Sequence, residues 1–229
     1  MCVGADRTGP PDRVRSVPES VEEFYARVIQ ATDDEGRLPL LDNQMPGWDI
    51  FPYELDGLRL KPLAALLEEE PARQGEDPAT CRCASGRPRD HVVWTDGRWT
   101  LQALDTGIPI VAMLVPQAHH DLADLPADLA AELGRLTVVI AAAIEALPSV
   151  GRCHVARYGD GGAHVHLFFF GRPARAGQFR GSTLVDWEEN LPRLPADVAA
   201  DNARFVAETI VTAYGGVVVP TSEEPATDR

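Results

Sequence analysis

Lysine is nearly absent from this chain of 229 residues: Lys61 is the only one. Acidic residues outnumber basic ones by 35 to 21, which gives a formal net charge of −14 at pH 7. Proteins that bind nucleic acids broadly carry a basic surface, so this composition argues against nucleic acid as a partner.

Long apolar runs are also missing. No segment approaches the roughly 18 consecutive apolar residues that a membrane-spanning helix needs, so we expect no membrane association. The first residues, MCVGADRTGPPDRVR, lack the apolar stretch of a secretory signal, and we therefore expect a cytoplasmic protein. Four cysteines in a reducing compartment are not expected to form a disulfide framework.

Several familiar catalytic signatures are absent too. The sequence has no phosphate-binding Walker loop, no Gly-x-Gly-x-x-Gly dinucleotide fingerprint and no Gly-x-Ser-x-Gly nucleophile elbow. Any chemistry must come from another arrangement of side chains.

What the chain does have is one dense segment, residues 161–172 (GGAHVHLFFFGR). Its alternation, its aromatics and its flanking glycines predict a buried strand entered from a tight turn. Residues two apart on a strand point the same way, so His164, His166 and Phe168 would share one face. The residues of the opposite, core-facing side would be Val165, Leu167 and Phe169. Two imidazoles on an otherwise apolar strand need partners, and imidazole can act as a metal ligand, a base or a nucleophile.

The rest of the chain predicts a sheet around this segment. The predicted elements, in order, are a helix near 20–32, a short helix near 62–70, strands at 91–95, 99–104 and 108–115, a helix near 127–147, a strand at 152–158, the histidine strand, a helix near 196–214 and a short strand at 217–219. Ser20-Val21-Glu22-Glu23 reads as a capping box at the start of the first helix. One apolar face marks the helix near 127–147, formed by Leu129, Leu133, Leu136, Ile140, Ile144 and Leu147. Asp96-Gly97 is a strong hairpin signal between the first two strands. Hairpin-connected strands with one long helix laid across them indicate an α+β fold with an antiparallel sheet.

We expect one core with extensions on both sides. The predicted parts are a disordered tail at 1–16, an N-terminal helix and an aromatic loop packed on the core at 17–80, the core itself at 81–175, a C-terminal helical extension at 176–219 that is irregular up to residue 195, and a tail at 220–229.

A second feature is a possible metal site. Cys81 and Cys83 are close enough together to suggest a metal clip, and two thiolates with two imidazoles favour tetrahedral zinc. His119 and His164 would complete the set, with His120 as an alternative to His119. The competing interpretation is that the cysteines are free and that His164 bonds to backbone.

The segment His164-Val165-His166-Leu167-Phe168-Phe169-Phe170, followed by Arg172, resembles the signature of the histidine-triad (HIT) superfamily. Phe168 occupies the position of the third histidine, and the branch related to galactose-1-phosphate uridylyltransferase also lacks that histidine, carrying glutamine there. The resemblance covers about residues 81–175. It implies a HIT-like sheet and, in the zinc-containing branch, zinc bound by a Cys pair, a His in a Pro-x-x-His segment such as 116–119, and the first motif histidine. Cys81-x-Cys83 departs from the usual Cys-x-x-Cys spacing.

The same resemblance implies a function. His166 would attack a phosphate and form a phosphoramidate, with His164 as zinc ligand or orienting neighbour, and Gly161, Gly162 and Arg172 would contact phosphate. The expected activity is a nucleotide hydrolase or nucleotidyl transferase that acts on a nucleotide or nucleotide-sugar, and the resemblance also implies a homodimer. Phe168 offers no donor to a phosphate oxygen, so the alternative is a non-catalytic nucleotide-binding or interaction module with structural zinc.

Overall fold

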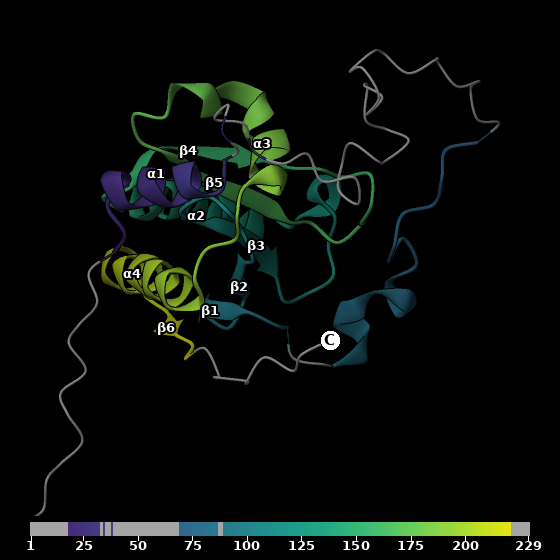
Figure 1. Cartoon of the computed structure of the whole chain (residues 1–229). Coiled ribbons are helices and arrows are strands. Elements are labelled where there is room, and N and C mark those ends of the chain that lie inside the picture. The colour runs from purple at the N-terminus through teal and green to yellow at the C-terminus, as the bar shows by residue number, and fades with distance from the viewer. Residues whose placement is uncertain (1–17, 33, 35–37, 39–68, 87–88, 221–229) are drawn as a thin grey trace, which may run out of the picture.

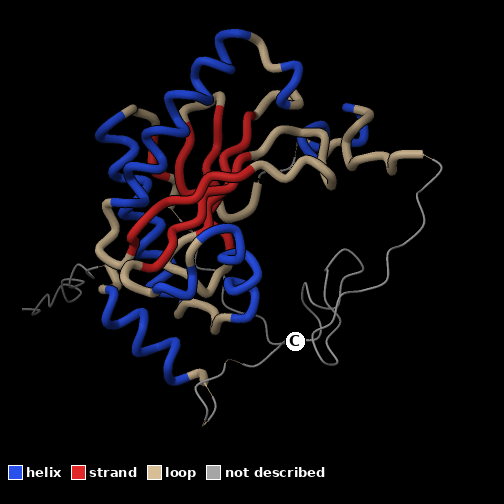
Figure 2. The backbone as a smooth tube through the Cα atoms, turned by 90° about the horizontal axis from the view of Figure 1, so that it is seen from above, coloured by secondary structure: helices blue, strands red, loops and turns tan. Residues whose placement is uncertain are grey.

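The computed structural model describes residues 18–32, 34, 38, 69–86 and 89–220 (Figure 1). Its strands form one six-stranded antiparallel sheet in the order β4-β5-β3-β2-β1-β6 (Figure 2). The strands are β1 (Val92–Thr95), β2 (Trp99–Leu104), β3 (Val111–Pro116), β4 (Val150–Ala156), β5 (Leu167–Pro173) and β6 (Val217–Val218). The α-helices are α1 (Val21–Gln30), α2 (Ala127–Glu145), α3 (Leu184–Asn190) and α4 (Ala196–Ala213). The expected α+β architecture is therefore confirmed.

Helices α2 and α4 cover one face of the sheet. The apolar stripe predicted for the long helix is buried, from Leu129 through Leu136 to Ile144, and it packs with Trp94 and Phe169 of the sheet. Burial of side chains this large contributes about 1.5–3 kcal/mol each, before the entropic cost of ordering the chain. This layer holds the central strands in place.

Helices α1 and α3 belong to the second core, on the other face. Phe24 of α1 meets Phe179 edge to face at 6.4 Å, and both pack with Phe170 of β5. Helix α1 begins with the predicted capping box, in which Ser20 Oγ accepts from Glu23 N and Glu23 accepts from Ser20 N. The N-terminal helix and the first part of the C-terminal extension thus cover one side of the sheet, while α4, later in that extension, covers the other with α2.

Several predicted strand boundaries were wrong; β4, expected at 152–158, is Val150–Ala156. Strand β5 begins at Leu167, so both histidines lie in the extended segment before it. The reason is that the backbone there bonds to loops: Ala163 N donates to Gln74 O and Val165 N to His120 O. Strand β3 likewise begins three residues later than expected, at Val111.

The segment 176–195, predicted to be irregular, contains two 3-10 turns and helix α3. Helix α3 is only 7 residues long, and tertiary packing of Leu184 holds it, so a sequence period could not reveal it. The predicted tail at 1–16, most of the aromatic loop and most of the helix near 62–70 lie outside the described residues; residues 69 and 70 are not helical. The division into parts stays a prediction.

Candidate metal centre and adjoining histidine

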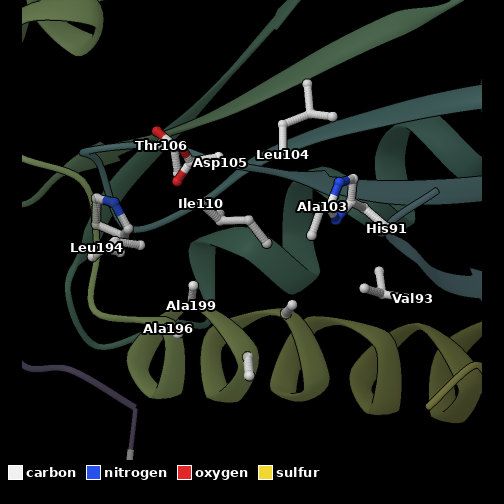
Figure 3. A pocket seen from close by; sticks show the side chains of 13 residues that line it. His91, Val93, Ala103, Leu104, Asp105, Thr106, Ile110, Leu194, Ala196 and Ala199 are labelled. Atoms are coloured by element: carbon white, nitrogen blue, oxygen red, sulfur yellow. The ribbon is translucent and has the colours of Figure 1, made fainter. Parts of the chain in front are cut away.

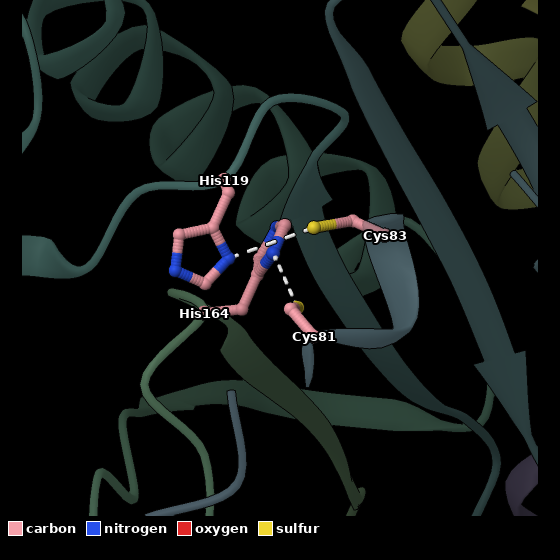
Figure 4. Close-up of side chains that lie close together, drawn as sticks. All are labelled: Cys81, Cys83, His119 and His164. Atoms are coloured by element: carbon pink, nitrogen blue, oxygen red, sulfur yellow. Dashed lines mark hydrogen bonds between the residues drawn. The ribbon is translucent and has the colours of Figure 1, made fainter. Parts of the chain in front are cut away.

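Four side chains from three separate segments meet at one end of the sheet (Figure 4). One ligand atom from each lies within 4.8 Å of all the others; the residues are Cys81, Cys83, His119 and His164. Cys81 lies between two consecutive 3-10 turns, 78–80 and 82–85, and Cys83 lies in the second. His119 follows β3, and His164 lies between β4 and β5. The structure thus brings together the whole set that the sequence suggested.

The distances within this cluster fit a tetrahedral metal. Cys81 Sγ is 3.5 Å from His164 Nδ1, and Cys83 Sγ is 3.5 Å from His119 Nδ1. With Zn–S bonds of about 2.3 Å and Zn–N bonds of about 2.0–2.1 Å, a regular tetrahedron has S···N edges of about 3.6 Å. The imidazoles of His119 and His164 stand edge to face, 5.2 Å apart, so the two Nδ1 atoms can face one point. The donor set present fits zinc.

His164 is held in the tautomer that a metal ligand needs. Its Nε2 is 2.9 Å from the carbonyl oxygen of Pro116, which can only accept, so Nε2 carries the proton and Nδ1 is free for the metal. Burial lowers the pKa of His164 to about 4, against a smaller opposing effect of the Pro116 carbonyl. The ring is therefore neutral at pH 7.

The unusual Cys-x-Cys spacing is accommodated by the tight turn. A 3-10 turn places Cys83 beside Cys81, and the intervening Arg82 points away to Asp90, 2.5 Å from its carboxylate. Burial, and after it the adjacent Cys81 sulfur, raise the pKa of the Cys83 thiol. A bound cation would reverse that by favouring the thiolate.

The choice between the two adjacent histidines falls on His119. His120 is outside the cluster, and its Nδ1 lies 3.9 Å from Asp124. Its backbone has a separate role, because His120 O accepts from Val165 N at 2.7 Å and so ties the loop after β3 to the histidine segment.

A carboxylate that the sequence analysis missed fixes the same loop. Asp121 accepts hydrogen bonds from Arg73 at 2.7 Å and from Arg157 at 2.5 Å. These bonds link the loop after β3 to the segment that contains Arg73 and to the end of β4. Burial acts to raise the pKa of Asp121, but the hydrogen bonds from these arginines lower it overall. An acidic residue among many in an acidic chain gave no signal of this role.

His166 lies next to the cluster without belonging to it. Its Nδ1 is 3.0 Å from the carbonyl oxygen of His164, so Nδ1 donates, and in the neutral tautomer with this bond Nε2 carries the lone pair. The side chain is half-buried, while its neighbour Val165 is 1% exposed. The alternation expected from the sequence therefore persists even though the segment is not a regular strand.

The glycine turn adjoins this imidazole. A Cβ added to Gly162 would lie 3.8 Å from His166 Cε1, and one added to Gly161 would meet open space. A backbone hydrogen bond holds the turn on one side, because Gln74 N donates to Gly161 O at 3.0 Å. Among the described residues, the N–H groups of Gly161 and Gly162 make no backbone hydrogen bond, and successive N–H groups of this kind can bind an anion.

Phe168, which stands where the HIT signature has its third histidine, is part of an aromatic group. Its ring meets His166 edge to face at 5.3 Å, Tyr158 at 5.8 Å and Phe170 at 5.9 Å. Tyr158 is 48% exposed, so this aromatic surface reaches solvent. It offers His166 a ring contact in place of a hydrogen-bond donor.

Arg172 is not brought to this site. It lies near the far end of β5, paired in register with Arg152 of β4, and its Nη1 donates to Pro173 O. Six residues of extended chain separate it from His166, which is about 20 Å at 3.3 Å per residue. The expected contact of Arg172 with a phosphate held by His166 stays a prediction, and this placement does not favour it.

Two cavities are lined by other parts of the described chain. One, of about 450 Å³, lies between α4 and the strands, with His91 and Thr106 among its lining residues (Figure 3). The other, of about 420 Å³, lies between α2 and the ends of β4 and β5. Neither is lined by His164 or His166. In the part of the chain that is described, no helix has the length and apolar character to cross a bilayer.

Comparisons with known proteins give a consistent but distant likeness. No protein-family model matches the chain, and no curated protein does. A Hit-like protein involved in cell-cycle regulation from Bartonella henselae is 12% identical with a TM-score of 0.44, covering 61% of this chain and 99% of that one. A zinc-bound histidine triad family protein from Mycobacterium smegmatis is 20% identical with a TM-score of 0.40, covering 57% and 94%. A hypothetical histidine triad nucleotide-binding protein from Sulfolobus tokodaii is 13% identical with a TM-score of 0.40, covering 58% and 95%. Similarity at this level does not assign a function, which must be argued from the site.

Proposed function

We propose that this chain is a HIT-like nucleotide hydrolase or nucleotidyl transferase that acts on a phosphoanhydride or nucleotidyl-phosphate bond. The observation that carries the proposal is the orientation of His166. The carbonyl of His164 accepts from Nδ1, so the lone pair of the neutral ring lies on Nε2, and the Gly161-Gly162 turn lies next to the ring. A neutral imidazole held in this way is a competent nucleophile near pH 7.

The proposed chemistry has two displacements. In the first, His166 Nε2 attacks the phosphorus of the nucleotide, an N–P bond forms, and the P–O bond to the leaving group breaks with its electron pair. In the second, an oxygen nucleophile attacks the phosphoramidate, the N–P bond breaks and Nε2 regains its lone pair. Water as the acceptor gives hydrolysis, and a phosphate or sugar-phosphate oxygen gives transfer. Throughout, the His164 carbonyl stabilises the positive charge that develops on the ring.

Zinc at Cys81, Cys83, His119 and His164 would be structural, because protein ligands fill all four positions of a tetrahedral site. When bound, it cross-links three segments of the chain. The contribution of this chain's own residues is then positional: His164 is fixed through Nδ1 and Nε2, so its carbonyl is fixed too, and that carbonyl orients His166.

The partners follow from this chemistry. The substrate would be a small nucleotide or nucleotide-sugar, handled in the cytoplasm, and the relation to the uridylyltransferase branch would lie in the missing third histidine and the zinc set. A homodimer is part of the same proposal. An acidic chain would approach an anionic substrate through local donors, since its overall charge of −14 repels anions.

A panel of nucleoside polyphosphates and nucleotide-sugars tests the proposal. The wild type should turn over at least one of them, and His166→Ala should abolish that turnover while keeping the zinc content. His120→Ala removes an imidazole from the neighbouring loop and should leave turnover intact, since His120 is outside the cluster. Turnover that survives in His166→Ala would refute the nucleophile, and no turnover of any compound by the wild type would refute the enzyme.

The second candidate is a nucleotide-binding or interaction module without turnover, with the same structural zinc. Phe168 favours it, because the ring beside His166 has no donor for a developing negative charge, and losing one such donor costs about 2.7–4 kcal/mol of barrier. Nucleotide binding by both wild type and His166→Ala, without product, would establish this module.

A further inference from the structure

The guanidinium of Arg89, next to the candidate metal cluster, has no acidic partner among the described residues. Arg89 Nη2 donates to Pro116 O at 3.1 Å and lies 3.3 Å from His164 Nε2. Arg89 is also half-buried. No carboxylate of the described residues lies within ion-pair distance of its guanidinium, whereas Arg82, in the same segment, is paired with Asp90.

The other arginines near the histidine segment either pair with a carboxylate or lie at the far end of β5. Arg73 and Arg157 both bond to Asp121, whose single negative charge they share, and Arg73 also reaches Glu76. Arg172 lies at the far end of β5. Among the described arginines that contact the histidine segment, Arg89 is therefore the one whose charge meets no carboxylate.

The metal cluster would not neutralise Arg89 either. Two thiolates balance one divalent zinc, and both imidazoles are neutral ligands, so the loaded cluster carries no net charge. A half-buried cation without a counter-charge is unfavourable, and such sites are normally completed by an anion. The guanidinium has five N–H donors, and only Nη2 is engaged by a described residue, which leaves a planar fork suited to a phosphate.

Arg89 also has the right neighbour. It contacts the Nε2 side of His164, and His166 is hydrogen-bonded to the carbonyl of that same residue. We propose that Arg89, and not Arg172, is the anion-binding residue of this site and holds a phosphate group of the ligand next to His166. The turn at 81–85 and the contact with His164 place Arg89 at this position. This inference rests on the proposed nucleotide function and adds the residue that recognises the phosphate.

The test compares AMP with adenosine, which differ only in the phosphate, by calorimetry on the zinc-loaded protein. The wild type should bind AMP more tightly than adenosine. Arg89→Gln should weaken AMP binding about tenfold to a hundredfold, the range for one lost hydrogen bond to a charged group, and leave adenosine binding unchanged. Arg89→Lys should lose less, and Arg82→Gln, from the same segment, should match the wild type.

Zinc content separates recognition from a structural role. Arg89→Gln should keep one equivalent of zinc, and loss of the metal in that variant would overturn the proposal. Unchanged AMP affinity in Arg89→Gln, a wild type that does not distinguish AMP from adenosine, or an equal loss in Arg172→Gln would overturn it as well. These failures are distinct from failure of the enzyme, which is read from turnover that depends on His166.

Discussion

Removing the metal should destabilise the protein by several kcal/mol. The cluster joins residues that are far apart in sequence: the Cys81–His164 pair spans 83 residues and the Cys83–His119 pair spans 36. A ligand that binds only the folded chain stabilises it by about 4.1 kcal/mol at a free concentration of 1,000 times Kd. For a chain of about 150–250 residues, each kcal/mol shifts Tm by about 2–4 °C, so we expect chelation to lower Tm by about 8–16 °C.

Thermal unfolding by circular dichroism measures this shift, with zinc quantified on the same samples. Cys83→Ala should lose zinc and unfold at the Tm of the chelated wild type. Cys153→Ala is the matched control, because Cys153 lies on β4 outside the cluster and burial raises the pKa of its thiol to about 12, so it should keep the metal. A chelated wild type that has lost all its zinc and still unfolds within about 2 °C of the loaded protein would refute the stabilisation of the fold by a zinc cross-link.

Other predictions concern single positions. Folding lowers the pKa of His164 from 6.5 to about 4, so in the metal-free protein the unfolded chain protonates this imidazole at a higher pH than the folded chain does. The free energy of unfolding of the metal-free protein should therefore fall as the pH drops from about 6.5 to about 4. A urea midpoint that stays constant across that window would contradict this. Ser20→Ala should cost about 1 kcal/mol in urea unfolding by removing the cap of α1, whereas Ser20→Asp should cost little; equal losses would contradict the cap. Gly171→Ala should lower the free energy of unfolding by about 1–3 kcal/mol, because the added Cβ would lie 2.9 Å from Ile110 Cγ2. An unchanged urea midpoint would show that the core rearranges to accommodate the methyl group. Phe168→His should raise turnover about tenfold or more if the missing donor limits the rate, and no gain would show that it does not.

Much of the fold could be read from the sequence because its signals are local. The apolar stripe of α2, the capping box of α1 and the Asp96-Gly97 hairpin each depend on residues close together in the chain, and each appears as expected. The start of β5 could not be predicted, because residues 74 and 120 take the backbone groups that a longer strand would use. Helix α3 was missed because packing, and not its own period, stabilises it.

The candidate site divides in the same way. Residue types and the motif pointed to Cys81, Cys83, His119 and His164, and the fold brings them together. The arginine that we propose as the anion-binding residue was not found from the sequence. Arg172 follows the motif closely, but an extended strand carries it about 20 Å away, while Arg89 arrives from a loop that nothing in the sequence connects to the histidines. The sequence therefore indicated the candidate metal ligands, but it did not indicate which arginine lies beside them.

The central claim is that His166 Nε2 forms a bond to phosphorus, and the most direct measurement is the mass of the intermediate. Wild type mixed with a substrate from the panel and denatured within milliseconds at alkaline pH, where a histidine N–P bond survives, should carry one nucleotidyl group on the peptide that contains His166. The adduct should be absent from His166→Ala and disappear from the wild type as product forms. Product formation with no adduct at any time, or an adduct on another residue, would contradict the account.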